Sequence, residues 1–325
     1  MALQFDMFTN DEGDTRPKRG RTMPAARSVP SRPSDDEMIE HLVQSGRYRI
    51  LRKLEPRAIA QVIRPEFPLR GLILDTETTG LDHRKDEIIE IGVIAFTFDA
   101  AGNLGDVTGL YGGLQQPSVP IPPDITKLTG ITDDMVAGHF IDMDALRELI
   151  EPADLIIAHN AAFDRPFCEA FSPLFVDRAW ACSNAEIGWK ARGYEGTKLG
   201  YLIGQSGYFH DGHRAVDDCF ALLEVLARDG EGGAGTAFSE LHAASKRSRV
   251  RIFAEGSPFD MKDLLKARGY RWADGSDGRP KSWWIELDEE ALDDELHYLR
   301  TDIYRWRDAD PPVRRLTAYD RFRAS

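Results

Sequence analysis

LILDTETTG, residues 72–80, is a short apolar run that ends in two carboxylates, Asp75 and Glu77. The side chains of a strand alternate between its two faces, so these carboxylates project to the same side. At a separation of ~4 Å their charges repel by roughly 4 kcal/mol at an effective dielectric of 20. A bound divalent cation would relieve this repulsion, whereas a solvated strand-to-turn junction, for which Asp, Thr and Gly are common residues, would avoid it. The stretch by itself supports the two interpretations equally.

The apolar patterns around this stretch predict an α/β domain. Three extended runs with short connections indicate an antiparallel meander, and they are GLILDT (71–76), IIEIGVIAFTF (88–98) and VTGLYGGLQ (107–115). Helical and extended patterns then alternate, helical over 124–150, extended over 154–160, helical over 163–171, extended over 175–183 and helical over 215–227. This order predicts a mixed five-stranded sheet flanked by helices.

The 325-residue chain divides by composition into five segments. We expect a disordered basic tail over 1–36, a helical prefix over 37–70, the α/β domain over 71–229, a linker over 230–248 and a small α+β module over 249–325. Within the last segment a helix, a hairpin and a final helix are expected, in the order α-β-β-α. The final helix should carry Leu292, Leu296, Leu299, Ile303 and Trp306 on one stripe.

The overall composition is typical of a soluble globular protein. Apolar residues make up 42% and charged residues 29%, and no run approaches the ~20 apolar residues that span a bilayer. Because no secretory signal is evident either, we expect a cytoplasmic protein with no membrane partner and with its three cysteines reduced. The net charge of −13 does not exclude nucleic acid, because basic residues gather over 15–32 and 246–285.

One further carboxylate is expected near the carboxyl end of the first strand, and a later segment carries two more candidate residues. Asp164 follows the strand DLIIAHN in the first turn of a helix, where an acid is also common for purely structural reasons. In HDGHRAVDD, His213 precedes a helix and Asp218 lies five residues later, roughly 140° around the axis. That spacing suits a histidine that acts as a base from another direction, although a capping or surface histidine has the same pattern. His210 and Asp217 are expected to lie outside the site.

The order DxE, HNxxFD and HxAxxD resembles the DEDDh family of 3′-to-5′ exonucleases, over about residues 70–228, and KLTGIT (127–132) resembles a further segment of that family. The resemblance implies a ribonuclease H-like fold. It also implies that Asp75, Glu77, Asp164 and Asp218 bind two Mg²⁺ or Mn²⁺ ions and that His213 is the general base. Thr78 and Leu81 would contact the 3′-terminal nucleotide of a nucleic acid with a free 3′ end.

Residues 4–8, QFDMF, form a candidate partner motif. They resemble the short peptide Q-x-x-[LM]-F with which bacterial replication and repair proteins bind the sliding clamp, so Gln4, Met7 and Phe8 would be the contacts. Five residues with two apolar anchors also occur by chance, and a disordered terminus is the alternative.

The C-terminal segment holds four of the six tryptophans, beside Arg268, Arg271, Arg279 and Lys281. A small module needs bulky side chains for its core, which is the role expected of Trp272 and Trp306. Strand alternation sends one of Trp283 and Trp284 inward and the other outward, where it would be able to stack on nucleic acid.

The function expected from the sequence is a metal-dependent 3′-to-5′ exonuclease that releases nucleoside 5′-monophosphates from DNA in replication or repair. An RNA 3′-end exonuclease is an alternative that the motifs leave open. A replication-associated interaction protein with a secondary nuclease centre is the alternative from another class, and the complete set of five site residues disfavours it.

Overall fold

The computed structural model describes residues 33–324, without 231–232, 234, 276–277 and 279, and the chain divides into two compact units, Met1–Ile50 and Leu51–Ser325. In the first unit, α1 (Asp35–Gln44) begins after Ser34, which forms a capping box with Glu37. The helix therefore starts two residues before the expected boundary at 37. None of its residues is buried. The clamp-motif residues 4–8 lie outside the described residues.

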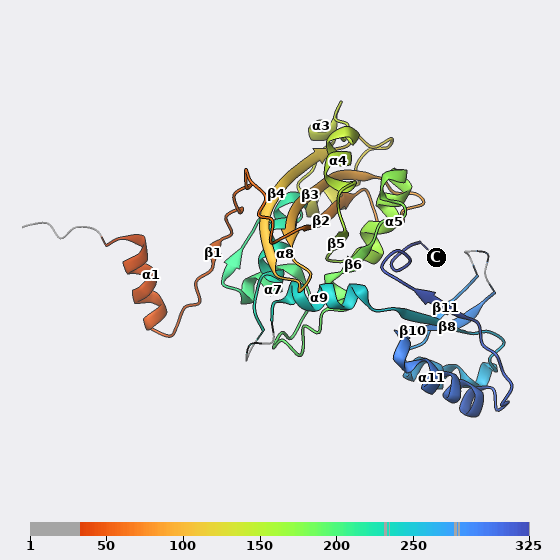
Figure 1. Ribbon diagram of the computed structural model, residues 1–325. Helices are drawn as coiled ribbons and strands as arrows, with labels where there is room; N and C mark the ends of the chain where they lie inside the picture. Colours follow the sequence, from red (N-terminus) through yellow and green to blue (C-terminus); the bar gives the residue numbers. More distant parts are fainter. Residues whose placement is uncertain (1–32, 231–232, 234, 276–277, 279, 325) are drawn as a thin grey trace, which may run out of the picture. The chain divides into compact units, whose positions relative to one another are not determined.

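The second unit contains the expected α/β domain (Figure 1). Its sheet has five strands, which are β2 (Leu69–Thr78), β3 (Ile88–Phe98), β4 (Leu104–Leu114), β5 (Leu155–Ala158) and β6 (Trp180–Cys182). The order is β4-β3-β2-β5-β6; β2, β3 and β4 pair antiparallel, and β5 runs parallel to both β2 and β6. This arrangement confirms the meander and the ribonuclease H-like mixed sheet.

The region between β4 and β5 is divided into three short helices where one helical stretch over 124–150 was expected. They are α2 (Pro123–Thr129), α3 (Asp133–Val136) and α4 (Met143–Ile150). Gly130 adopts a left-handed conformation with φ of 72° and ends α2, and the Thr132 side chain then caps α3. The breaks therefore come from local capping residues that interrupt a helical hydrophobic pattern.

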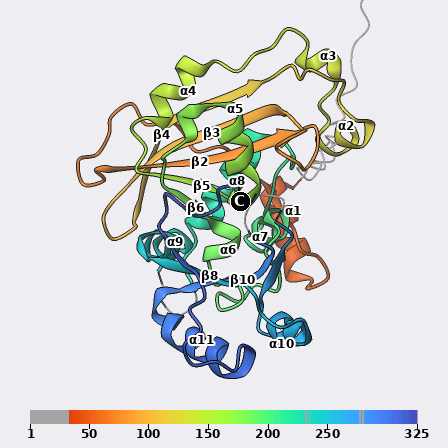
Figure 2. The ribbon, with the colours of Figure 1, turned by 90° about the vertical axis from the view of Figure 1, so that its right-hand side faces the viewer.

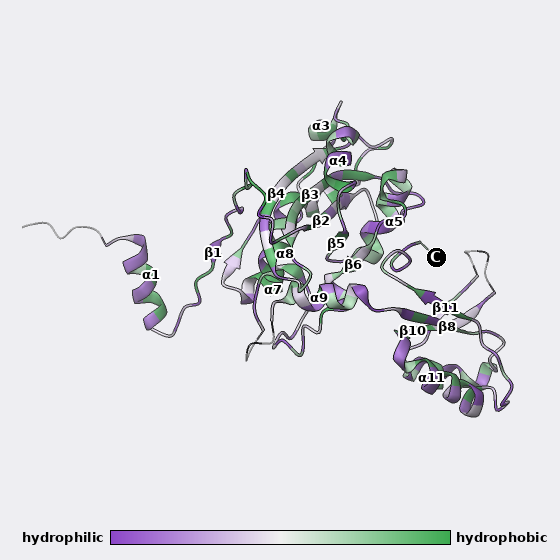
Figure 3. Cartoon of the chain, viewed as in Figure 1, coloured by the Kyte–Doolittle hydropathy of each residue, from purple (hydrophilic) through white to green (hydrophobic). Residues whose placement is uncertain are grey.

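Helices cover both faces of the sheet, and the strand residues alternate between two cores. Leu72 and Leu74 of β2 pack in a cluster with residues of α4 and α5 (Ala161–Phe171), whereas Ile73 packs with residues of the opposite layer. That layer contains α7 (Leu199–Gln205), α8 (Ala215–Leu226) and α9 (Ala237–Lys246). The central strands are accordingly hydrophobic on both faces (Figure 3).

The expected linker over 230–248 is partly wrong, because α9 occupies most of it. Phe238 and Leu241 of this helix are fully buried, and Phe238 packs edge-on against Phe96 and Phe98 of β3. The glycines over 230–235 suggested a linker, but the apolar residues after them belong to the core of the α/β domain. The extended pattern over 175–183 is likewise shorter in the structure, where 173–175 forms the 3-10 helix η1 (Pro173–Phe175) and β6 begins at Trp180.

Gly92 of β3 allows the start of α8 to lie close to the sheet. Gly92 of β3 pairs with Asp75 of β2, and a Cβ on Gly92 would lie 2.3 Å from the backbone carbon of Ala215. Only a residue without a side chain permits this approach. Cys219, one turn further along α8, donates its thiol to the carbonyls of Ile73 and Gly92. The first turn of α8 therefore lies directly against β2 and β3.

The C-terminal module has two more strands than expected, in the order β-α-β-β-α-β. The strands are β8 (Arg249–Ala254), β9 (Arg271–Ala273), β10 (Ser282–Asp288) and β11 (Val313–Leu316), arranged β11-β8-β10-β9. The helical segments are η3 (Phe259–Met261), α10 (Lys262–Ala267), η4 (Glu289–Ala291), α11 (Leu292–Tyr298) and the π-helix η5 (Leu299–Ile303). Strand β11 is short and rich in arginine, so it has no apolar alternation in the sequence. Strand β8 (RVRIFA) does alternate its arginines with the buried Val250 and Ile252, and this signal was missed.

Two of the four module tryptophans differ from their expected places. Trp272 is 53% exposed and Trp306 is 60% exposed, so neither builds the core that was expected to need them. Trp283 and Trp284 do point to opposite faces, since Trp283 packs against the core with Leu265 and Leu299 while Trp284 lies beneath Arg251.

In the described part of the chain, no helix is long and apolar enough to cross a membrane.

Two short strands complete the second unit. They are β1 (Arg52–Lys53) and β7 (Tyr208–Phe209), which pair parallel. The remaining short helix, α6 (Ser183–Glu186), directly follows β6.

Candidate active site

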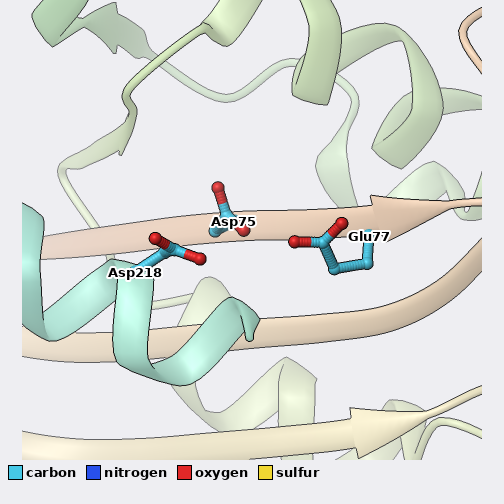
Figure 4. A group of neighbouring side chains, drawn as sticks. All are labelled: Asp75, Glu77 and Asp218. Carbon is cyan, nitrogen blue, oxygen red and sulfur yellow. The ribbon is translucent and has the colours of Figure 1, made fainter. Parts of the chain in front are cut away.

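Three carboxylates meet beside β2, where α8 begins. Asp75 and Glu77 project from the same face of β2, and Asp218 comes from the first turn of α8 (Figure 4). One oxygen from each of the three lies within 4.8 Å of the other two, and all three residues are partly buried. The close approach of α8 at Gly92 thus carries Asp218 to the two strand carboxylates.

The environment of the two strand carboxylates, Asp75 and Glu77, opposes their ionisation. Burial and, next, the charges of Asp164, Asp218 and Glu77 raise the pKa of Asp75 well above its usual value. Burial, followed by the charges of Asp218, Glu90 and Asp164, raises the pKa of Glu77 to about 8. Like charges in a poorly solvated site disfavour the charged form. A cation placed between the oxygens would reverse that preference.

Asp164 lies next to this group, but its own hydrogen bonds hold it differently. It is 3% exposed in the first turn of α5, and its Oδ1 accepts hydrogen bonds from the backbone N–H of Thr76 at 3.2 Å and the Thr76 hydroxyl at 2.9 Å. Burial raises the pKa of Asp164 to about 7, although these hydrogen bonds oppose the shift. Its charge acts on Asp75 and Glu77, so the fourth expected carboxylate borders the cluster of three.

Two histidines approach the cluster, and one of them was not expected there. The Nδ1 of His213 lies 4.0 Å from the Oε1 of Glu77, its side chain is 54% exposed, and its backbone has a positive φ of 64°. The expectation that His210 lies outside the site is wrong. Its Nε2 lies 2.7 Å from the Oδ1 of Asp218, and its side chain is 8% exposed. The neighbouring turn at Asp211 and Gly212 brings both rings to the same end of α8.

Glu90 is a site residue that the sequence analysis missed. It lies in β3 opposite Glu77, is 5% exposed, and accepts hydrogen bonds from the Arg214 guanidinium at 2.9 Å and the Ala215 backbone N–H at 3.1 Å. It therefore fixes the start of α8, three residues before Asp218. The signal was present in the sequence as a single acid inside the apolar run IIEIGVIAF.

The two residues expected to contact substrate lie after the carboxylates. Thr78 is 5% exposed and donates its hydroxyl to the Gly80 carbonyl at 2.6 Å, so it shapes the turn that follows β2. Leu81 is 85% exposed in that turn. An apolar side chain exposed beside a polar site is available to a ligand.

The donor set fits a hard divalent cation. Three carboxylates supply only oxygen ligands, which Mg²⁺ and Mn²⁺ prefer, and no sulfur or ring nitrogen is part of the group of three. No Lys or Arg of the described residues forms an ion pair with Asp75, Glu77 or Asp218 within 4.0 Å, where the basic neighbours are the two histidines. The charge of Arg214, which is paired with Glu90, lowers the pKa of Glu77 but does not offset the effects that raise it. The arrangement is suited to hold cations beside a reacting phosphate.

Comparisons with known proteins agree with this geometry. A family model described as an exonuclease matches residues 72–226. A DNA polymerase III subunit epsilon from Treponema pallidum (strain Nichols) is 33% identical over 161 residues, which cover 47% of this chain and 72% of the relative. A PolC-type DNA polymerase III from Thermotoga maritima is 30% identical over 165 residues, which cover 48% of this chain and only 12% of the relative.

Solved structures with similar folds include two nucleases. Exonuclease X in complex with 5′ overhanging duplex DNA has a TM-score of 0.36 and 22% identity, over 52% of this chain and 99% of that chain. Escherichia coli exonuclease I in complex with a dA16 oligonucleotide has a TM-score of 0.43 and 15% identity, over 78% of this chain and 64% of that chain.

Proposed function

Because the chain belongs to the DEDDh exonuclease family, we propose that it is a metal-dependent 3′-to-5′ exonuclease that acts on DNA and releases nucleoside 5′-monophosphates. The observation that carries the proposal is the group Asp75, Glu77 and Asp218, whose oxygens lie within 4.8 Å of one another without a cationic side chain between them. A role in replication or repair and a cytoplasmic location belong to the same proposal, and the relatives' names support the first of these.

The residues of the site have distinct parts in this proposal. Asp75, Glu77 and Asp218 hold two Mg²⁺ or Mn²⁺ ions, and Asp164 contributes as the fourth carboxylate. When bound, such ions supply the Lewis acidity that an in-line phosphoryl displacement needs. Thr78 and Leu81 contact the terminal nucleotide from the turn after β2.

His213 is the proposed general base. Its ring is half exposed and lies 4.0 Å from Glu77, so it is free to move towards a water held beside the carboxylates. Histidine is the side chain most often used to accept a proton near neutral pH. His210 hydrogen-bonds to Asp218 and is therefore proposed to orient that carboxylate.

The direct test is the digestion of 3′-labelled and 5′-labelled single-stranded DNA, duplex DNA and RNA with Mg²⁺ or Mn²⁺. The proposal predicts shortening from the 3′ end, release of 5′-monophosphates, no activity in EDTA and loss of activity in an Asp75→Ala/Glu77→Ala variant. Preference for RNA would favour the alternative substrate. Equal activity in the double variant, or shortening only from the 5′ end, would rule out the mechanism.

A pair of histidine variants separates the two rings. His213→Gln is expected to lower kcat by roughly 10²- to 10⁴-fold, the usual contribution of a general base. His210→Gln removes a partner of Asp218. It is expected to raise the Mg²⁺ concentration needed for half-maximal activity more than it lowers kcat at saturating Mg²⁺. The opposite ranking of kcat would reassign the base to His210.

The candidate clamp motif at residues 4–8 remains a prediction. Its test is binding of a peptide of residues 1–15 to a bacterial sliding clamp, with Met7→Ala/Phe8→Ala as the control. Binding that the control loses would support the motif. No binding at high peptide concentration would remove it.

A further inference from the structure

The sheet of the C-terminal module has one face covered by helices and one face rich in arginine. The core cluster beneath α10 and α11 includes Val250 and Ile252 of β8 and Ile285 of β10. Directly paired residues of neighbouring strands share a face. The register pairs Trp284 with Arg271 of β9, and it also pairs Arg251 of β8 with Glu286 of β10 and with Arg314 of β11. These residues lie on the face away from the core, which is the face away from α11 in Figures 1 and 2.

This arginine-rich face forms one wall of a cleft of about 670 Å³. Arg249, Arg251, Arg271 and Trp284 line it from the module, while His83, Asn160 and Pro166 line it from the α/β domain. Two acids also line the cleft, but Glu186 pairs with Arg321 and Glu286 pairs with Arg251. The cleft thus has an aromatic ring, a net excess of arginine and two walls from different parts of the second unit.

The cleft reaches the same turn and helix that border the three carboxylates. His83 belongs to the turn after β2, which carries Glu77 at its end. Asn160 precedes α5, whose first turn carries Asp164 four residues later. A strand of nucleic acid in the cleft is therefore able to continue to the candidate active site.

Buried ion pairs and hydrogen bonds fix the module against the α/β domain. Arg165 of α5 has no exposed side-chain surface, and its guanidinium donates to the carbonyls of Ala318, Tyr319 and Arg321 at 2.7–3.2 Å. Arg321 in turn forms an ion pair with Glu186, and both side chains are at least 98% buried. The two walls of the cleft are consequently held in place before any ligand binds.

The chemistry of the module wall favours nucleic acid. The Arg251 guanidinium lies over the Trp284 ring, 4.6 Å from its centre, and the Arg271 guanidinium lies over it at 5.5 Å. The ring therefore has two cationic neighbours. Arg251 is neutralised by Glu286, but within the described ranges no carboxylate forms an ion pair with the exposed Arg271. Stacking rings together with basic side chains are the means by which proteins bind single strands without sequence preference.

We propose that this cleft binds the single-stranded nucleic acid that leads to the candidate active site, with Trp284 stacking on a base and Arg271 contacting a phosphate. The choice of ligand rests on the proposed exonuclease function. An acidic peptide would use the arginines but would gain little from an indole ring, so it is the less favoured occupant. The cleft would anchor the strand away from its reacting end.

The experiment measures the affinity of the full chain for a fluorescein-labelled dT20 by anisotropy in EDTA, where binding is separate from hydrolysis. Trp284→Ala is expected to weaken binding roughly 5- to 100-fold, the usual effect of losing one stacking ring. Trp272→Ala is the matched control, because this exposed tryptophan pairs with Trp283 on the other face of the same sheet. It should bind like the unaltered chain.

A charge variant provides a second test in case Trp284→Ala does not fold. Arg271→Glu changes an exposed side chain whose packing contact is the Trp284 ring, and it should weaken binding and lower the salt dependence of the affinity. Arg315→Glu is its control. Residue 315 pairs with Val250, a core residue, so it lies on the face of the sheet opposite the cleft. Equal affinity of Arg271→Glu and Arg315→Glu would overturn the proposal, as would displacement of dT20 by poly-glutamate at the same charge concentration.

The nuclease assay keeps this inference distinct from the proposed function. If the unaltered chain binds dT20 through Trp284 but hydrolyses none of the labelled substrates with metal, the exonuclease proposal fails and the cleft stands. If it hydrolyses DNA while Trp284→Ala binds dT20 unchanged, the exonuclease proposal stands and the cleft is overturned.

Discussion

The carboxylate cluster should make the metal-free protein less stable as pH rises, and Glu77→Gln should remove much of that cost. The pKa of Glu77 is raised to about 8, first by burial and then by the charges of Asp218, Glu90 and Asp164. In the unfolded chain the same group has its ordinary pKa of 4.5. Between these two values the folded state binds more protons than the unfolded state. Stability therefore falls through this pH window.

The size of the effect follows from the shift. At pH 7 the unfolded group is ionised, and keeping the folded group protonated costs about 1.36 kcal/mol for each pH unit above 4.5, or about 3 kcal/mol in total. Glutamine is neutral at every pH and of similar shape, so it avoids this cost but leaves a buried amide to satisfy. We expect Glu77→Gln to raise the free energy of unfolding by about 1 to 3 kcal/mol at pH 7 and by nearly nothing at pH 4.5.

The assay is urea unfolding at pH 5, 7 and 8.5, in EDTA and in Mg²⁺. Glu148→Gln is the control, because Glu148 is an exposed carboxylate on α4. At pH 8.5, Mg²⁺ should raise the free energy of unfolding of the unaltered protein by binding the ionised cluster. It should raise that of Glu77→Gln by less. If Glu77→Gln in EDTA gains no more than Glu148→Gln at pH 8.5, or gains equally at pH 5, the electrostatic reasoning is refuted.

Three more predictions concern the supports of the site. Gly92→Ala should destabilise the protein by about 1–3 kcal/mol in urea unfolding and lower kcat, because its Cβ would meet the Ala215 backbone at 2.3 Å. Gly200→Ala in α7 is its control, and it should be neutral or stabilising because nothing lies within 4 Å of the added Cβ. Arg321→Met should cost about 3–5 kcal/mol in urea unfolding, since it leaves Glu186 buried without its partner, and a smaller loss in a variant that also carries Glu186→Gln would support that cause. Glu90→Gln should lower kcat and raise the Mg²⁺ requirement, whereas an effect on KM alone would contradict its role in placing α8.

Much of the site region follows from local pattern. Strand β3 coincides with the apolar run IIEIGVIAFTF, and α8 ends one residue before the predicted boundary. Glu77 falls on the same face as Asp75 because strand alternation requires it. The position of Asp218 beside them depended on the resemblance to a family, since the spacing within one helix gives no distance to another strand.

The parts that could not be predicted are those set by contacts between distant segments. The hydrogen bonds of Arg165 join residues more than 150 positions apart, and the pairing of β8 with β11 links residues about 60 positions apart. An arginine-rich strand such as VRRL has no local pattern that distinguishes it from a loop. His210 was placed outside the site for a related reason, because the turn at Asp211 and Gly212, not the sequence interval, decides which ring reaches Asp218.

The treatment of buried acids elsewhere in the chain sharpens the interpretation of the cluster. The side chains of Glu90, Glu186 and Glu295 are each at least 93% buried, and each forms an ion pair with an arginine, Arg214, Arg321 and Arg268 respectively. Asp164 instead has two hydrogen bonds from Thr76. Asp75 and Glu77 have no such cationic partner among the described residues, although the pKa of each is raised by burial. A chain that neutralises its other buried glutamates with its own arginines, and leaves these two without one, is best explained if the neutralising cations come from solution.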